Sequence, residues 1–197
     1  MEAFWIATGT VFLGELGDKT QLLAVMLASR FRRPWIVVAG ILLATVLNHA
    51  VAGLAGSWIR TVLPDEWLHW IVGLSFIAVG LWAIKPDGID ESEAQRSGRS
   101  VLWITVVSFF LAEIGDKTQI ATTVLAARFD DLLQVVAGTT SGMLLADVPV
   151  VFLGAAIATR LPLTAIRWTA AGLFVVLGVT TLIWGGTWLG VGAGQAG

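Results

Sequence analysis

Six long apolar stretches, separated by short polar connections, account for most of this 197-residue chain. They cover approximately residues 3–27, 35–59, 67–84, 101–127, 132–158 and 168–189. An α-helix needs roughly 20 apolar residues to cross about 30 Å of hydrocarbon, and these stretches approach or exceed that length. The ten Trp residues, which favour the lipid–water boundary, fall near the stretch ends. The pattern predicts an all-α integral membrane protein with six transmembrane helices.

The second half of the chain repeats the first. Residues 14–21 read GELGDKTQ and residues 112–119 read AEIGDKTQ, and an offset of 98 positions also aligns Gly40 with Gly138. Because each half has three spans, an odd number, the second half must enter the membrane from the opposite side. We predict two inverted three-helix repeats, residues 1–84 and 101–197, joined by a polar linker at 85–100 in one transmembrane domain.

The distribution of basic residues predicts the orientation, because Lys and Arg accumulate in cytoplasmic loops. One side carries Arg30, Arg32, Arg33, Lys85, Arg96, Arg99, Arg160 and Arg167, and the other carries Arg60 and Arg128. The linker is therefore expected in the cytoplasm and both termini outside. The start of the chain lacks the basic segment of a secretory signal, so we expect the first helix to be retained.

Composition excludes several classes of protein. The chain has no Cys, which excludes disulfides, zinc thiolates, iron–sulfur clusters and thiol catalysis. A net charge of −2 without a basic cluster gives no support for nucleic-acid binding. Only 13% of residues are charged, about half the usual 25%, yet acids lie inside two apolar stretches. We expect no cofactor.

Each motif places a row of oxygen donors near the middle of a predicted span. On a continuous helix the two Glu, two Asp and two Gln side chains would follow at i, i+3 and i+6. Hard oxygen ligands of this kind suit magnesium, calcium or manganese. The predicted metal ligands are Glu15, Asp18, Gln21, Glu113, Asp116 and Gln119.

The remaining motif residues have predicted supporting roles. Thr20 and Thr118 can add ligands, and the two motif glycines permit local unwinding of the helix. Lys19 and Lys117 can position a carboxylate or repel cations from an empty site. Alternatively, Glu15–Lys19 and the equivalent pair in the second half are i, i+4 ion pairs that only fix helix packing.

A second polar pair recurs at the same offset, because His49 and Asp147 occupy equivalent positions in the second span of each half. They could relay protons or complete the site; hydrogen-bonded packing is the alternative. Pro149 is expected to break the helix near Asp147. Gly138 and Gly142 predict tight helix packing within the monomer, and a homodimer is a further possibility.

Four carboxylates crowded at low dielectric cannot all stay ionised without a cation, so protons and metal compete for the same oxygens. A site that opens to one side at a time would then exchange metal for protons. There are four alternative functions: a passive divalent cation channel, an exporter of small organic cations, an intramembrane enzyme, and a structural or assembly factor. We expect no enzyme, since no nucleophile with a partnered base is apparent.

The doubled Glu-x-Gly-Asp-Lys-Thr motif resembles that of the calcium:proton antiporter-two family. That family includes Golgi and chloroplast manganese/calcium transporters and small bacterial manganese exporters. The resemblance covers most of the chain and implies a cation/proton antiporter for manganese or calcium, with the motif acids as ligands and proton carriers. It also implies manganese export across a bacterial inner membrane, with metal ions, protons and the lipid bilayer as partners.

Overall fold

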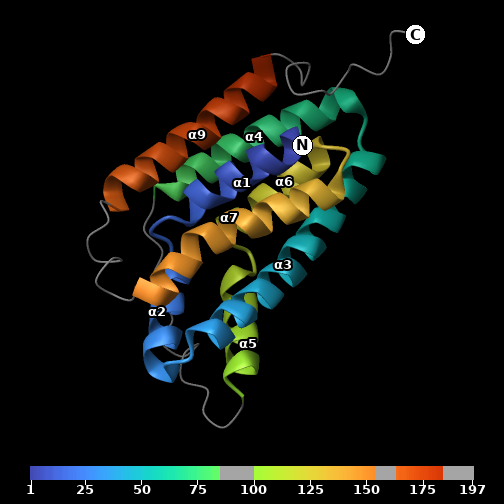
Figure 1. Ribbon diagram of the computed structural model, residues 1–197. Coiled ribbons are helices and arrows are strands. Elements are labelled where there is room, and N and C mark those ends of the chain that lie inside the picture. Colours follow the sequence, from blue (N-terminus) through green and yellow to red (C-terminus); the bar gives the residue numbers. More distant parts are fainter. Residues whose placement is uncertain (85–99, 154–162, 184–197) are drawn as a thin grey trace.

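The computed structural model describes residues 1–84, 100–153 and 163–183, and these residues form helices and no strand (Figure 1). The helices are α1 (Glu2–Glu15), α2 (Lys19–Phe31), α3 (Pro34–Val62), α4 (Asp65–Ala83), α5 (Val101–Glu113), α6 (Lys117–Arg128), α7 (Leu132–Leu153) and α9 (Leu163–Ile183). The all-α prediction is confirmed for this part of the chain. Linker residues 85–99, residues 154–158 of the fifth stretch and 184–189 of the sixth lie outside the described residues, as do Lys85, Arg96, Arg99 and Arg160.

The first and fourth apolar stretches are not continuous helices, and this part of the prediction was wrong. Each is divided into two helices, α1 with α2 and α5 with α6. The break follows Glu15 in the first stretch and Glu113 in the second. The motifs therefore lie at a break in the helix rather than along one helical face.

Two helices, α3 with 29 residues and α7 with 22, are each long and apolar enough to cross a membrane. Shorter apolar helical segments lie in α4, α5 and α9. Large apolar side chains also cover the outside of the molecule, among them Trp35, which is 74% exposed, and Leu133, which is 78% exposed. An apolar exterior of this kind fits a lipid environment, while the crossing by six spans stays a prediction.

Contacts between helices recur at the offset of 98. In α7, a Cβ atom at Gly138 would lie 2.5 Å from the Phe4 carbonyl oxygen of α1. Gly40 of α3, the equivalent of Gly138, lies in the same way against Leu102 and Thr105 of α5. Glycine at these positions is needed because a side chain would hold the helices apart. The small residues thus pack helices within the monomer.

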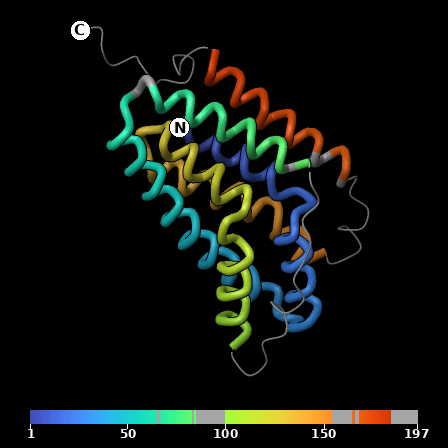
Figure 2. The backbone as a smooth tube through the Cα atoms, turned by 180° about the vertical axis from the view of Figure 1, so that it is seen from behind, coloured from blue at the N-terminus to red at the C-terminus, as the bar shows by residue number. Residues whose placement is uncertain are grey.

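The contacts between α4 and α9 also recur at the offset of 98. Gly73 and Gly178 approach each other, as do Gly80 and Ala171, and adding or subtracting 98 converts one contact into the other. The two helices run side by side in both views of the backbone (Figures 1 and 2). The halves are therefore built into one helical body by contacts that recur in pairs.

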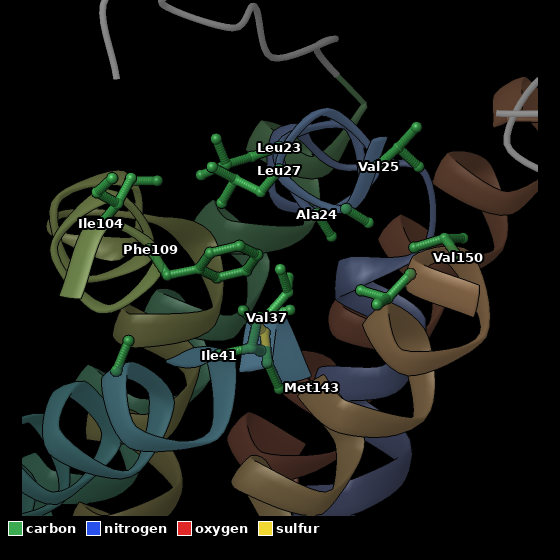
Figure 3. Close-up of a cluster of buried hydrophobic side chains, with 14 of the residues drawn as sticks. Leu23, Ala24, Val25, Leu27, Val37, Ile41, Ile104, Phe109, Met143 and Val150 are labelled. Atoms are coloured by element: carbon green, nitrogen blue, oxygen red, sulfur yellow. The ribbon is translucent and has the colours of Figure 1, made fainter. Parts of the chain in front are cut away.

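A buried apolar core supports the residues that precede both motifs. It joins side chains of α2, α3, α5 and α7, including Leu27, Ile41, Phe109 and Met143 (Figure 3). Ala112, which immediately precedes Glu113, belongs to the same core. A close-packed environment of this kind fixes where the helices end, so the motif residues start from a rigid base.

The two ends of the helical body are packed differently. At one end, Gly56 of α3 touches the backbone of Thr123 in α6 so closely that no Cβ would fit. Arg60, one turn further on, donates to the Arg128 carbonyl oxygen at 2.8 Å and pairs with Asp130. At the opposite end, a cavity of about 750 Å³ is lined by α2, the start of α3 and the start of α5.

Candidate cation site

Each motif begins with a tight turn that ends one helix before the next begins. Leu16 has φ −61° and ψ 115°, Gly17 has φ 77°, and the Asp18 N–H donates to the Glu15 carbonyl oxygen at 3.0 Å. These values define a type II turn, which requires a positive φ at its third residue and therefore glycine. The second motif has the same turn, with Gly115 at φ 74° and a 3.0 Å bond from Asp116 to Glu113.

The Thr and Gln side chains of each motif hold the turn together. The Thr20 hydroxyl donates to Glu15 Oε2 at 2.5 Å, and the Thr118 hydroxyl donates to Glu113 Oε2 at 3.1 Å. The last motif residue accepts from the glycine N–H, Gln21 from Gly17 at 2.8 Å and its equivalent Gln119 from Gly115 at 2.7 Å. Each Glu keeps its second oxygen, Oε1, without a hydrogen-bond partner among the described residues.

The lysines connect the two motifs to each other. Lys117 Nζ lies 3.0 Å from Asp18 Oδ1, and Lys19 Nζ lies 3.2 Å from Asp116 Oδ1. The ion pairs therefore cross between the halves, and the alternative of i, i+4 pairs with the preceding Glu is wrong. It fails because the turn at Gly17 separates Glu15 from Lys19, so the two residues are not on one helix.

Three of the four motif acids form one buried cluster, and Asp18, which pairs with Lys117, is not part of it. Glu15, Glu113 and Asp116 each offer a carboxylate oxygen, and these three oxygens lie within 4.8 Å of one another. Both Glu side chains are fully buried and Asp116 is 1% exposed. Oxygens at this spacing, from two helix ends and one helix start, can surround a single cation.

Other predicted residues lie around this cluster. Thr20 and Thr118 are fully buried and bonded to the motif Glu side chains. The Gln21 side chain forms two hydrogen bonds to the backbone. Its Oε1 accepts from the Gly17 N–H, and its Nε2 donates to the Ala146 carbonyl oxygen at 3.0 Å. Both Gln side chains thus hold the helix break in place, while any ligand role for them stays a prediction.

His49 and Asp147 are both fully buried, in α3 and α7. Asp147 lies within electrostatic range of Glu15, Asp18 and Glu113. The expected helix break beside Asp147 does not occur, because α7 continues through Pro149 to Leu153. A proline removes one backbone donor but can be accommodated in a helix whose neighbours support it.

Sequence reasoning missed the crossed pairing of the two halves. The signal was present, because each motif has Asp and Lys next to each other and the motifs recur at one offset. Two sites related by a two-fold exchange can pair the Asp of one with the Lys of the other. The alternative of pairing along one helix required the helix to continue through the glycine, and it does not.

Comparison with known proteins finds relatives of this chain. A family model described as "Divalent cation/proton antiporter GDT1" matches residues 3–91 and 101–188. A Vibrio cholerae protein named "Putative manganese exporter" is 45% identical over 182 residues, which is 92% of this chain and 90% of that protein. A GDT1-like protein of Synechocystis is 31% identical, covering 92% of this chain and 97% of the relative. An Arabidopsis thaliana protein, GDT1-like protein 5, is 25% identical, with 93% and 96% covered. No solved structure matches the chain.

Proposed function

Because the chain belongs to the GDT1 family of divalent cation/proton antiporters, we propose that it exports manganese in exchange for protons. The observation that carries this proposal is the buried cluster of Glu15, Glu113 and Asp116, whose oxygens lie within 4.8 Å of one another. Family membership confirms the resemblance seen in the motif. The description of the family names divalent cations and protons as substrates. Manganese as the transported ion is part of our proposal.

The chemistry of the cluster supports a divalent cation as the transported ion. The four motif acids and the two motif lysines carry a formal charge of −2 when all are ionised, which one divalent cation would balance. Carboxylate oxygens are the ligands that manganese and calcium accept readily. The similarity to a protein named as a manganese exporter favours manganese.

Proton coupling follows from the burial of the same oxygens. Carboxylates this close together in a low-dielectric interior repel one another strongly unless a cation or protons compensate their charge. Metal release therefore favours proton uptake, and proton release favours metal binding. Exchange requires that the cluster opens to one side of the membrane at a time, which is the alternating access of secondary transporters.

The proposed architecture is six transmembrane segments in two inverted repeats, with the linker in the cytoplasm and both termini outside. Its support comes from contacts that recur at an offset of 98 and from the two broken helices. Helices broken at the substrate site are typical of inverted-repeat transporters. A bacterial inner membrane is the proposed location.

The test is metal flux in proteoliposomes that contain the purified full-length chain, measured for manganese and calcium under set pH gradients. We expect protons to drive manganese uphill, and both Glu15→Gln and Glu113→Gln to reduce that flux at least about a hundredfold, since each removes a charged ligand. Glu2→Gln is the matched control, because Glu2 is exposed at the start of α1 and should transport normally.

The other outcomes separate the competing functions. Manganese flux that follows its own gradient and ignores pH would indicate a channel. Flux of organic amines without metal flux would indicate an organic cation exporter. Normal antiport by Glu113→Gln would remove the cluster from the mechanism.

A further inference from the structure

Two of the buried polar side chains without a hydrogen-bond partner among the described residues occupy equivalent positions in the repeat. His49 and Asp147 are both 0% exposed, and neither ring nitrogen of His49 nor either oxygen of Asp147 has a hydrogen-bond partner among the described residues. Burying a polar group without a partner is unfavourable, because its hydrogen bonds to water are lost and not replaced. A side chain that only fixed packing would be expected to satisfy its polar atoms, so these two atom pairs point to a ligand.

The position of Asp147 is tied to the first motif. The carbonyl of the preceding residue, Ala146, accepts from Gln21, which also binds the turn at Gly17. The Asp147 carboxylate lies within electrostatic range of Glu15, Asp18 and Glu113, which come from both motifs. Asp147 therefore adds a further carboxylate beside the cluster.

His49 has the equivalent place in the other half. Asn48, next to it, donates to the Phe110 carbonyl oxygen at 3.2 Å, which ties α3 to the last turn of α5 before Glu113. The offset of 98 positions relates the Lys117–Asp18 pair to the Lys19–Asp116 pair, and it also relates Asp147 to His49. By this equivalence, the imidazole is the counterpart, on the side of the second motif, of the carboxylate that lies near the first.

We propose that His49 and Asp147 complete the cation site with one nitrogen and one oxygen donor, and that His49 makes the site prefer a transition-metal ion over calcium. This inference rests on the proposed function. It goes further because it assigns ion selectivity to His49. Position 49 differs from its equivalent, position 147, whereas the motif acids are the same in both halves.

The chemistry of the donors explains the preference. Calcium takes six to eight oxygen ligands, and it gains little from an imidazole nitrogen. First-row transition metals accept imidazole readily. A site made only from the doubled motif would offer carboxylate, hydroxyl and carbonyl oxygens to both ions. Nitrogen at position 49 removes one oxygen position that calcium could use.

The test is metal binding by the purified full chain in detergent, read from the electron paramagnetic resonance of free Mn²⁺, with Ca²⁺ as competitor. We expect His49→Asp, which places the residue of position 147 at position 49, to bind Mn²⁺ but to lower the Mn²⁺/Ca²⁺ affinity ratio about tenfold or more. Asp147→Asn should weaken the binding of both ions. His69→Asp is the matched control, since the chain has two His and His69 lies in α4 outside the cluster.

An unchanged affinity ratio in folded His49→Asp would overturn the inference. If that variant does not fold, His49→Gln reads the same ratio with a neutral oxygen donor of similar size, and an unchanged ratio there has the same meaning. The proposed function fails separately: it fails if the wild-type chain binds no Mn²⁺ or if Glu113→Gln binds it normally. Loss of binding in Glu113→Gln with an unchanged ratio at position 49 would overturn the selectivity role alone.

Discussion

The two halves of the molecule share one motif but differ in what surrounds it. The side chain of Lys117 is 4% exposed, whereas that of Lys19, its equivalent, is 25% exposed. Helix α3 packs closely on α6 at Gly56, whereas the equivalent residue 154 lies outside the described residues. The same motif therefore lies in different surroundings in the two halves, with its lysine buried in one and partly exposed in the other.

This difference bears on how one site can serve two sides of a membrane. In an exact two-fold arrangement, the two ends of the helical body would be packed in the same way. Here the end that holds Gly56 and Arg60 is closely packed, and the other end contains the 750 Å³ cavity. For the proposed exchange, interchanging the packing of the two halves would close one end and open the other.

The largest expected effect comes from removing the buried lysine. Lys117→Met takes the ammonium away from a buried carboxylate, and breaking a buried pair in this way costs about 3–5 kcal/mol. Lys19→Met should cost less, because Lys19 is partly exposed and water replaces some of the interaction. Unfolding in detergent, followed by Trp fluorescence, measures both. Equal losses would mean that the two lysines are in equivalent surroundings.

Gly56→Ala should loosen the closely packed end. A Cβ atom there meets the backbone of Thr123, so α3 and α6 must move apart, and overpacking of this kind costs about 1–3 kcal/mol. The control is Gly9→Ala in α1, where a Cβ atom meets nothing within 4 Å. That change should stabilise the helix by up to about 1 kcal/mol. The difference between the two unfolding midpoints tests the contact, and similar midpoints would argue against it.

Arg60→Ala removes the connection from α3 to Arg128 and Asp130. A pair this exposed contributes at most about 1 kcal/mol to stability, so its effect should appear as access rather than unfolding. The chain has no Cys, so a Thr123→Cys variant reports on this end through its rate of maleimide labelling. We expect Arg60→Ala to raise that rate severalfold.

The labelling control is Thr169→Cys in the exposed part of α9, whose rate should not change. If Arg60→Ala leaves the rate at position 123 unchanged, the connection does not hold this end closed.

The smallest effect concerns the starts of α7 and α3. Asp131 accepts from the Gln134 N–H at 3.0 Å, whereas Arg33, its equivalent, provides no side-chain cap. Hydrogen bonds from the backbone and side chain of Gln134 lower the pKa of Asp131 below 3.8. Its contribution to stability is therefore present above about pH 4 and is lost as pH falls through the folded-state value.

We expect Asp131→Ala to lower the unfolding midpoint slightly at pH 7, with the difference from wild type shrinking in more acidic buffer. A difference that grows on acidification would contradict the sign. Arg33→Ala at the equivalent position should show no such pH dependence.

The sequence predicts the fold where the local signal and the tertiary environment agree. Apolar length was sufficient to place α3 and the start of α7 to within a few residues, since both are long uninterrupted helices. The motif acids were recognised because charge inside an apolar stretch is costly and therefore informative. Gly17 was recognised as a place where the helix can unwind, and the structure confirms this, but the division into two separate helices was not predicted. Glycine is tolerated inside helices, and only its positive φ in the folded chain distinguishes a turn from a helical residue.

Partner choice was the other limit. Lys19 could pair along its own helix or across to Asp116, and both choices satisfy the spacing in the sequence. Only the contacts between the halves select the second. Long-range pairing depends on how helices pack as bodies, which no local pattern of residues contains.

The crossed ion pairs also constrain how the chain can diverge. Asp18 belongs to one copy of the repeat and Lys117 to the other. A change of charge in either copy therefore leaves a charged residue of the other copy without its ion-pair partner. Two duplicated segments that met only through apolar surfaces could drift apart independently. These two cannot, because the Asp of each copy forms its ion pair with the Lys of the other copy. We therefore expect the charged residues of both motifs to be retained together.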